Sequence, residues 1–188
     1  MGLPRNPGQC TGEDPPLCSR KLSAVQLNSV ISKVWSELTT EEVYGIARLR
    51  TDVFLREQRV DDEELDGRDL EPATRHWWIA DERGVAAYLR TLLDERAEHR
   101  DAHRVIGRVV TRADRRGEGL ADRLVRAVVE RHGDEALLLH AQTYVAGLYA
   151  RSGFETFGDE FEEAGIPHIG MHRSASPAPG AALPTLEA

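Results

Sequence analysis

The sequence lacks any long run of apolar residues. Its longest apolar stretches, such as Ala136 to Leu139, fall far short of the roughly 20 residues that a membrane-spanning helix needs. The N-terminus also lacks the continuous apolar core of a secretory signal peptide. These absences predict a cytoplasmic protein that has no membrane partner.

Cysteine is scarce, and basic residues are outnumbered. Cys10 and Cys18 both lie in a Pro- and Gly-rich N-terminal stretch, and no later cysteine exists to pair with them. The chain has 32 acidic residues against 24 basic ones, and its formal net charge is -8 at pH 7. A carboxylate surplus repels nucleic-acid backbones and anionic lipid. We therefore expect no structural disulfide, no metal site and no nucleic-acid partner, and this charge favours a cationic substrate.

Apolar residues concentrate in the middle of the chain. Residues 1–32 are rich in Pro, Gly, Ser and polar side chains, and from residue 174 onwards the sequence has no apolar periodicity. Such segments cannot build a hydrophobic core. A total of 188 residues suits a single domain. We expect a flexible extension over residues 1–32, one domain over 33–173 and a disordered tail over 174–188.

Hydrophobic periodicity predicts both strands and helices within this domain. A strand is expected around residues 34–38, and a capping box at Thr39 and Glu42 predicts a helix that runs to about Arg56. Further runs predict strands over residues 77–80, 85–93, 105–111 and 136–142, two final strands around 165–167, and helices over 120–132 and 145–151. The predicted fold class is α/β (α+β), with a mixed, mostly antiparallel sheet of six to seven strands and about four helices.

An acidic loop follows the first predicted helix. Residues 60–74 hold seven carboxylates: Asp61, Asp62, Glu63, Glu64, Asp66, Asp69 and Glu71. Like-charge repulsion predicts that much of this loop is solvated. The loop also suits the entrance of a cationic substrate, with Asp66 and Asp69 as direct partners, and a run of merely solvated charges is the alternative. His76 opens the next strand; it is a candidate substrate contact, although we favour an anchoring hydrogen bond to the loop.

The most informative stretch, residues 104–129, combines an apolar strand, a small-residue turn and an amphipathic helix. Gly117 and Gly119 let the backbone approach a ligand closely, and free amides at a helix N-terminus can hold a pyrophosphate. Arg116 adds a charge-assisted contact. The turn lacks the Gly-Lys-Ser/Thr of nucleoside-triphosphate loops and the third glycine of dinucleotide loops. A plain glycine turn is the alternative to an anion site.

This turn, Arg-Gly-Glu-Gly-Leu-Ala at residues 116–121, resembles the Arg/Gln-x-x-Gly-x-Gly/Ala signature of the GNAT superfamily of acetyl-CoA-dependent N-acetyltransferases. Residues 147–154, Gly-Leu-Tyr-Ala-Arg-Ser-Gly-Phe, are similar to a second motif of that superfamily. Residues 50–58, 75–76 and 165–171 resemble its ElaA-type branch. The resemblance covers residues 33–173, and Ala121 stands where glycine is commoner.

The resemblance implies a sheet that is splayed at its central strands and a site for acetyl-CoA as co-substrate, without a metal. Backbone amides of the splayed strand would hold the pantetheine arm and polarise the thioester carbonyl. The glycine turn would hold the pyrophosphate. The cofactor-binding candidates are Val109, Val110, Thr111, Arg116, Gly117, Glu118, Gly119, Leu120 and Ala121.

Acetyl transfer to an amine needs one group that takes the amine's proton and another that protonates the departing thiolate. Tyr149 matches the family's thiolate-facing tyrosine, and an aromatic residue that closes the core edge is the alternative. Glu57 is our first choice of base, because partial burial would raise its pKa; a surface glutamate is the alternative. His168 is a second candidate, for proton relay or substrate contact, against a core histidine. Gln142 ends a buried strand and is a candidate ligand contact without a catalytic role.

The predicted function is an N-acetyltransferase that moves an acetyl group from acetyl-CoA to a primary amine of a small molecule or protein, by direct attack in a ternary complex. A non-catalytic acyl-CoA sensor is one alternative. An acyltransferase like the acyl-homoserine-lactone synthases is another, since the Val-Phe-x-x-Glu segment at residues 53–57 resembles those enzymes. The sequence does not identify the amine, and a homodimer is left open.

Overall fold

The computed structural model describes residues 28–60 and 63–176. The predicted extension up to residue 27 and the predicted tail from residue 177 lie outside the described residues. The helices and strands are β1 (Val30–Val34), α1 (Thr40–Arg50), η2 (Thr51–Glu57), β2 (Arg75–Asp81), β3 (Gly84–Leu93), β4 (Arg104–Thr111), α2 (Leu120–Arg131), β5 (Leu137–Gln142), α3 (Ala146–Ala150), β6 (Glu155–Glu163) and β7 (Ile166–Arg173). No helix within the described ranges has the length and apolar character needed to cross a membrane.

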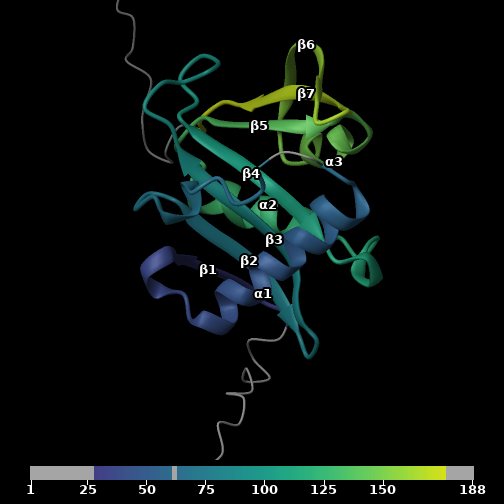
Figure 1. The fold of residues 1–188 in the computed structure, drawn as a ribbon. Helices are drawn as coiled ribbons and strands as arrows, with labels where there is room; N and C mark the ends of the chain where they lie inside the picture. Colours follow the sequence, from purple (N-terminus) through teal and green to yellow (C-terminus); the bar gives the residue numbers. More distant parts are fainter. Residues whose placement is uncertain (1–27, 61–62, 177–188) are drawn as a thin grey trace, which may run out of the picture.

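A mixed sheet organises the chain (Figure 1). Its strand order is β1-β2-β3-β4-β5-β7-β6, and neighbouring strands are antiparallel except for the parallel pair of β4 and β5. The seven strands found across residues 28–60 and 63–176 confirm the predicted mixed, mostly antiparallel sheet. Three α-helices occur in the same residues, where the sequence predicts about four. The remaining short helical segments are 3-10 turns and the π-helical η2.

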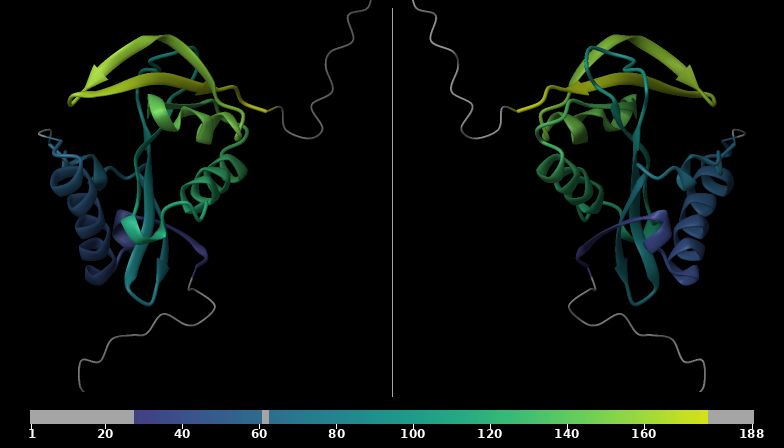
Figure 2. Two further views of the ribbon diagram at one scale, coloured as in Figure 1. Left: turned by 90° about the vertical axis from the view of Figure 1, so that its right-hand side faces the viewer. Right: turned by 90° about the vertical axis from the view of Figure 1, so that its left-hand side faces the viewer.

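The two longer α-helices cover opposite faces of the sheet (Figure 2). Successive strand residues point to opposite faces, so Trp77 packs in the core under α2 and Trp78 in the core under α1. Leu124 of α2 is buried in the first core and Ile46 of α1 in the second. Each fully buried aliphatic or aromatic side chain contributes about 1.5–3 kcal/mol to stability, and these contacts hold both helices on the sheet.

The first helix begins where the sequence predicts. The Thr39 hydroxyl accepts a hydrogen bond from the Glu42 amide at 3.2 Å, and the Glu42 carboxylate accepts one from the Thr39 amide at 2.9 Å. The strand expected over residues 34–38 is wrong in position, because β1 ends at Val34. A 3-10 turn follows it, in which the Glu37 carboxylate accepts a hydrogen bond from the Val34 amide at 3.1 Å. The strand itself begins at Val30, inside the stretch expected to be extension.

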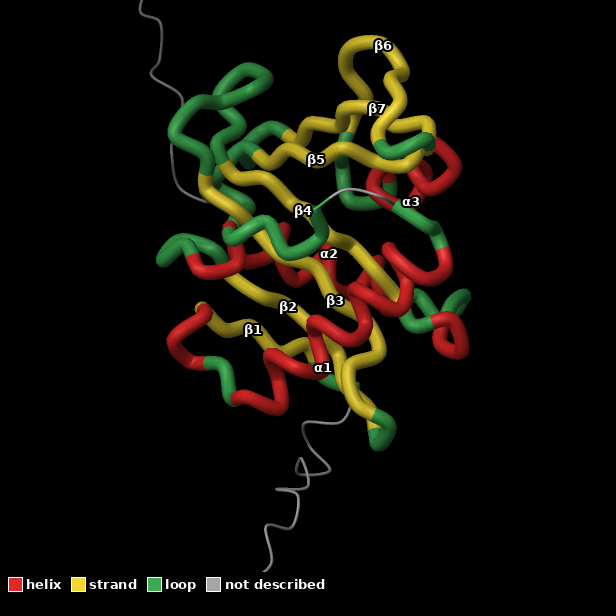
Figure 3. Tube along the Cα trace, viewed as in Figure 1, coloured by secondary structure: helices red, strands yellow, loops and turns green. Residues whose placement is uncertain are grey.

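The helix expected to run as one α-helix to about Arg56 changes its winding after Arg50. Residues Thr51–Glu57 form the π-helix η2, where the Gln58 amide donates to the Val53 carbonyl, five residues back, at 2.9 Å. The wider turn still leaves Val53 buried, so apolar spacing alone does not distinguish it from an α-helix. Figure 3 shows the helical stretch that starts with α1 lying across the sheet in front of β3.

The sheet opens between β4 and β5. Residues 104–106 of β4 pair with residues 137–139 of β5, although β4 continues to Thr111 and β5 to Gln142. Past this paired part, β4 carries a bulge against β3, and Arg108 adopts a positive φ of 54°. The two strands then diverge (Figure 1), which confirms the splay that the family resemblance implies.

Candidate active site

A cavity of about 350 Å³ lies where β4 and β5 diverge. Its wall comes from these two strands, α3, the acidic loop and the turn between β6 and β7. Five candidates from the sequence line it: Asp66, Val109, Gln142, Tyr149 and His168. The other candidates, Glu57, His76, Val110, Thr111 and residues 116–121, lie outside its wall. The fold therefore brings a proposed cofactor strand and two catalytic candidates to one cavity.

The glycine turn has the backbone conformation that its sequence predicts. Gly117 has a φ of 80° and Gly119 a φ of 74°, a region that side-chain-bearing residues rarely adopt. A Cβ atom added at either position would meet no described atom within 4 Å, so the space beside the turn is open. Gly119 is also the N-cap of α2, and no described side chain caps that helix. The first-turn amides are therefore free to bind an anion.

The Arg116 side chain is held by two partners. Its Nη1 and Nη2 atoms donate to the two carboxylate oxygens of Glu57 at 2.7 and 2.8 Å, and its Nε donates to the Thr111 carbonyl at 3.2 Å. The hydrogen bond and the charge of Arg116 lower the pKa of Glu57 and outweigh the opposing effect of desolvation. Glu57 is about half exposed. The expected rise of the Glu57 pKa is therefore wrong, because an arginine partner takes the place of an apolar pocket.

Tyr149 sits on α3 with 5% of its surface exposed. Burial raises the pKa of Tyr149 well above its ordinary value, and the nearby Tyr144 adds to the rise. Among residues 28–60 and 63–176, no group hydrogen-bonds the Tyr149 hydroxyl, although the residue lines the cavity. The hydroxyl is not one of the buried side-chain atoms that lack a partner, so a ligand in the cavity can reach it.

His168 lies on β7 directly opposite Gln142 of β5 and is 9% exposed. Its Nδ1 is 2.8 Å from the carbonyl oxygen of Ile166. A carbonyl can only accept a hydrogen bond, so Nδ1 carries the proton and Nε2 keeps the lone pair in the neutral ring. The ring stacks on Phe161 with centroids 6.0 Å apart, which fixes its plane. His168 thus lines the cavity, and in the neutral ring its Nε2 can accept a hydrogen bond.

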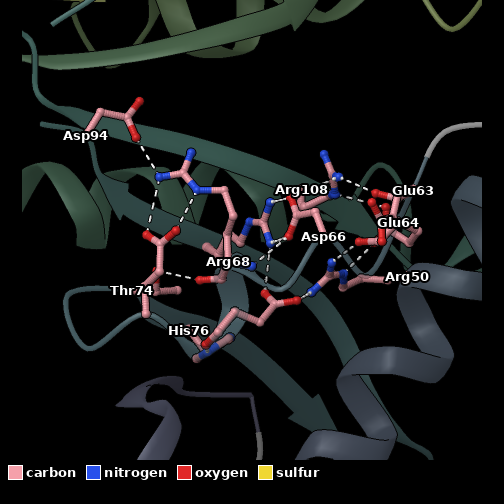
Figure 4. Close-up of polar contacts among 12 residues, drawn as sticks. Arg50, Glu63, Glu64, Asp66, Arg68, Thr74, His76, Asp94 and Arg108 are labelled. Atoms are coloured by element: carbon pink, nitrogen blue, oxygen red, sulfur yellow. Dashed lines mark hydrogen bonds and ion pairs between the residues drawn. The ribbon is translucent and has the colours of Figure 1, made fainter. Parts of the chain in front are cut away.

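The acidic loop is solvated only in part: within residues 63–74 Glu63 is exposed, but two other carboxylates are not. Glu64 and Asp69 are buried, with 7% and 8% of their surfaces exposed. Both pair with Arg50 of α1, which Figure 4 shows beside Glu64, and Asp69 also pairs with Arg90 of β3. Arg50 and Arg90 are 1% and 3% exposed. Buried charges of one sign require partners of the other, and these arginines neutralise the repulsion that the sequence alone suggests.

The same ion-pair network reaches the cavity. Arg90 holds the carboxylate of Asp66 with two nitrogens, and Arg108 approaches Glu64 at 2.9 Å and Asp66 at 3.4 Å. Desolvation tends to raise the pKa of Asp66, but hydrogen bonds and charge from Arg90, the Arg68 amide and Arg108 lower it to about 2. Asp66 is therefore an ion-paired carboxylate at the wall, and its charge is already compensated. The sequence does carry a signal for this ion-pair network, because arginines that lie inside otherwise apolar segments are expected to be buried with acidic partners.

His76 has an anchoring position and does not line the cavity between β4 and β5. It is 1% exposed, with Nε2 3.1 Å from the Asp69 carbonyl and Nδ1 2.8 Å from the Tyr88 hydroxyl. Burial lowers the pKa of His76 and favours the neutral ring. Its bond to the Asp69 carbonyl fixes the acidic loop to strand β2, which agrees with the anchoring role that the sequence favours.

Sequence reasoning missed two side chains beside Gln142. Gln58 and Gln142 exchange amide hydrogen bonds of 3.4 and 3.5 Å, and the Tyr144 hydroxyl donates to Gln142 at 2.7 Å. The contacts join the end of η2 to the end of β5 across the opening. Gln58 lies in a segment that carries the family resemblance, whereas Tyr144 has no signal in the sequence.

Comparison with known proteins identifies the family. The model described as "Acetyltransferase (GNAT) domain" matches residues 34–175. The chain belongs to the GNAT acetyltransferase family. It is 38% identical over 151 residues to a UPF0039 protein of Mycobacterium bovis, covering 80% of this chain and 96% of that one. It is also 35% identical over 144 residues to the protein ElaA of Escherichia coli, covering 73% and 91%.

Solved structures agree with this assignment. An acyl-CoA N-acyltransferase from Pseudomonas aeruginosa is 36% identical, with a TM-score of 0.69 over 78% of this chain and 99% of that chain. The structure of E. coli ElaA is 30% identical, with a TM-score of 0.68 over the same shares. A CoA-dependent acyl-homoserine lactone synthase shares the fold at 18% identity and a TM-score of 0.63. This GNAT protein is an ElaA-like acyltransferase, and its family uses acyl-CoA co-substrates.

Proposed function

We propose that this GNAT acyltransferase uses acetyl-CoA and acetylates a primary amine directly in a ternary complex. The observation that carries the proposal is the presence of Tyr149 and His168 in one cavity at the unpaired ends of β4 and β5. One residue can give a proton and the other can accept one, as amide formation from a thioester requires. Neither role needs a metal ion.

The bound thioester is proposed to follow the open edge of β4. Amides in the segment Val109 to Thr111 hold the pantetheine arm and polarise the carbonyl. The turn at residues 116–121 holds the pyrophosphate, a role supported by the positive φ of Gly117 and Gly119 and by the uncapped start of α2. Val109 lines the cavity, so this path delivers the acetyl group to Tyr149 and His168.

The transfer balances with these two residues. The amine nitrogen forms a bond to the carbonyl carbon while the carbon–sulfur bond breaks. His168 takes the proton that the nitrogen loses through Nε2, and the Tyr149 hydroxyl gives a proton to the departing sulfur. The high pKa of Tyr149 keeps this donor protonated at any working pH. Exchange with water then restores both side chains.

We favour His168 over Glu57 as the base. Glu57 lies outside the cavity wall, and Arg116 binds both of its carboxylate oxygens. This arginine lowers the pKa of Glu57, which makes the carboxylate a weaker proton acceptor. His168 lines the cavity, and its Nδ1 contact leaves Nε2 free to accept a proton.

A thiol-release assay with a panel of primary amines tests the proposal. The Tyr149→Phe variant should lower kcat by about 100-fold and leave the Kd for acetyl-CoA unchanged. Tyr44→Phe is the matched control, since Tyr44 is 70% exposed on α1, and its kcat should not change. If acetyl-CoA binds and no amine releases thiol, the protein is an acyl-CoA sensor and the catalytic proposal is wrong.

A further inference from the structure

The Arg116 guanidinium has no free edge for a phosphate group. Arginine binds two oxygens side by side either through Nη1 and Nη2 or through Nε and one Nη atom. Glu57 occupies the first edge at 2.7 and 2.8 Å, and the Thr111 carbonyl takes the Nε hydrogen of the second at 3.2 Å. Side-by-side binding of two pyrophosphate oxygens by Arg116 therefore requires one of these partners to leave.

The Glu57 carboxylate is the partner that can exchange. The Thr111 carbonyl belongs to β4 and is fixed by the sheet, whereas Glu57 is the last residue of η2 and is about half exposed. Carboxylate and phosphate oxygens both suit the same pair of guanidinium donors. In the described part of the chain, Glu57 is also the one carboxylate that pairs with Arg116.

The end of η2 places this carboxylate beside the turn. The Gln58 amide bonds to the Val53 carbonyl at 2.9 Å, and the Gln58 side chain bonds to Gln142 across the opening. Glu57 therefore directly precedes an anchored residue and reaches the loop at residues 116–121 through its pair with Arg116. The nearest other acid of the turn, Glu118, is engaged by Arg115 at 2.8–2.9 Å.

We propose that Glu57 is an internal competitor of the cofactor pyrophosphate, and that Arg116 changes partner from Glu57 to the pyrophosphate when a CoA species binds. This inference rests on the proposed function. The competition acts on acetyl-CoA and on free CoA alike, because both carry the same pyrophosphate. Its consequence for turnover is faster loss of the CoA product, since Glu57 recovers Arg116 as the product leaves.

Calorimetric titration of Glu57→Gln tests this role. The glutamine amide keeps the size of the side chain and removes its charge. The variant should therefore bind both acetyl-CoA and CoA more tightly, with each Kd lowered by about two- to five-fold, the range expected for losing an exposed ion pair. 3′-Dephospho-CoA keeps the pyrophosphate and should show the same fall. The control is Asp52→Asn, which changes the net charge equally within η2 but removes contacts to Arg48 and Arg56; its Kd values should match the wild type.

Several outcomes would overturn the inference. Weaker or unchanged binding by Glu57→Gln would mean that Glu57 orients Arg116 or has no part in binding. An equal gain in affinity in Asp52→Asn would indicate a general charge effect. If Glu57→Gln bound acetyl-CoA more tightly but 3′-dephospho-CoA no more tightly than the wild type does, the competition would be with the 3′-phosphate. Glu57→Ala provides a second variant if the glutamine variant folds poorly. No binding by the folded wild type would instead refute the proposed function itself.

Discussion

Replacing Arg50 with methionine should destabilise the fold strongly. The Arg50 guanidinium donates to the Asp69 carboxylate at 2.8 Å and to the Glu64 carbonyl at 2.6 Å, and it also pairs with the Glu64 carboxylate. Both acids remain buried in the variant. Removing one member of a buried pair destabilises by about 3–5 kcal/mol, and Arg90 and Arg108 compensate part of this, so we expect a loss of about 3 kcal/mol.

Urea unfolding at pH 7, followed by circular dichroism, measures this change. Methionine preserves much of the side-chain length, so packing contributes little to the loss. Arg48→Met is the control on the same helix; Arg48 is 70% exposed and lies 3.8 Å from Asp52, and its change should stay within about 0.5 kcal/mol. Adding Glu64→Gln to Arg50→Met should recover part of the stability. A loss below about 1 kcal/mol for Arg50→Met would refute the view that this network holds the acidic loop.

Three further predictions concern the site. The pKa of Asp66 is about 2 in the fold against an ordinary 3.8. The contribution of its ion pairs to folding stability is therefore present above about pH 4 and is lost as the pH falls towards about 2. Asp66→Asn should flatten the stability–pH curve in that window by about 1 kcal/mol after solvent screening. His168→Gln should lower kcat by about 100-fold with the Kd for acetyl-CoA unchanged, and a kcat near the wild-type value would remove His168 as base. Gly119→Ala should weaken acetyl-CoA binding by about tenfold, whereas Gly84→Ala, which also alters a positive-φ glycine, should lower stability without affecting affinity.

Local signals predicted much of the fold. The capping box at Thr39 and Glu42 acts within four residues, and both of its hydrogen bonds are present. Alternation along a strand separates the neighbours Trp77 and Trp78 into two cores. Gly117 and Gly119 take positive φ values that their lack of a side chain permits. Such features depend on the backbone geometry of a short segment, so a single sequence is enough to predict them.

Features that depend on distant partners could not be predicted in the same way. The described acids of the loop pair with Arg50, Arg90 and Arg108, which lie 14, 24 and 44 residues along the chain from their partners. Glu57 has a lowered pKa because Arg116, 59 residues away, reaches it. The π-helical winding of η2 also escapes an analysis of apolar spacing. Charges far apart in the sequence meet only once the sheet has formed, and their pairing sets the pKa values.

Binding of acetyl-CoA at the turn of residues 116–121 is the central claim, and calorimetric titration tests it most directly. The wild type should bind acetyl-CoA saturably at one site per chain. Arg116→Ala should weaken binding by about tenfold, as expected for loss of a charge-assisted contact. Arg126→Ala is the control on α2, because Arg126 is 65% exposed and pairs with Asp122, and its affinity should equal that of the wild type. No saturable binding by the folded wild type, or an equal loss in both variants, would contradict the account.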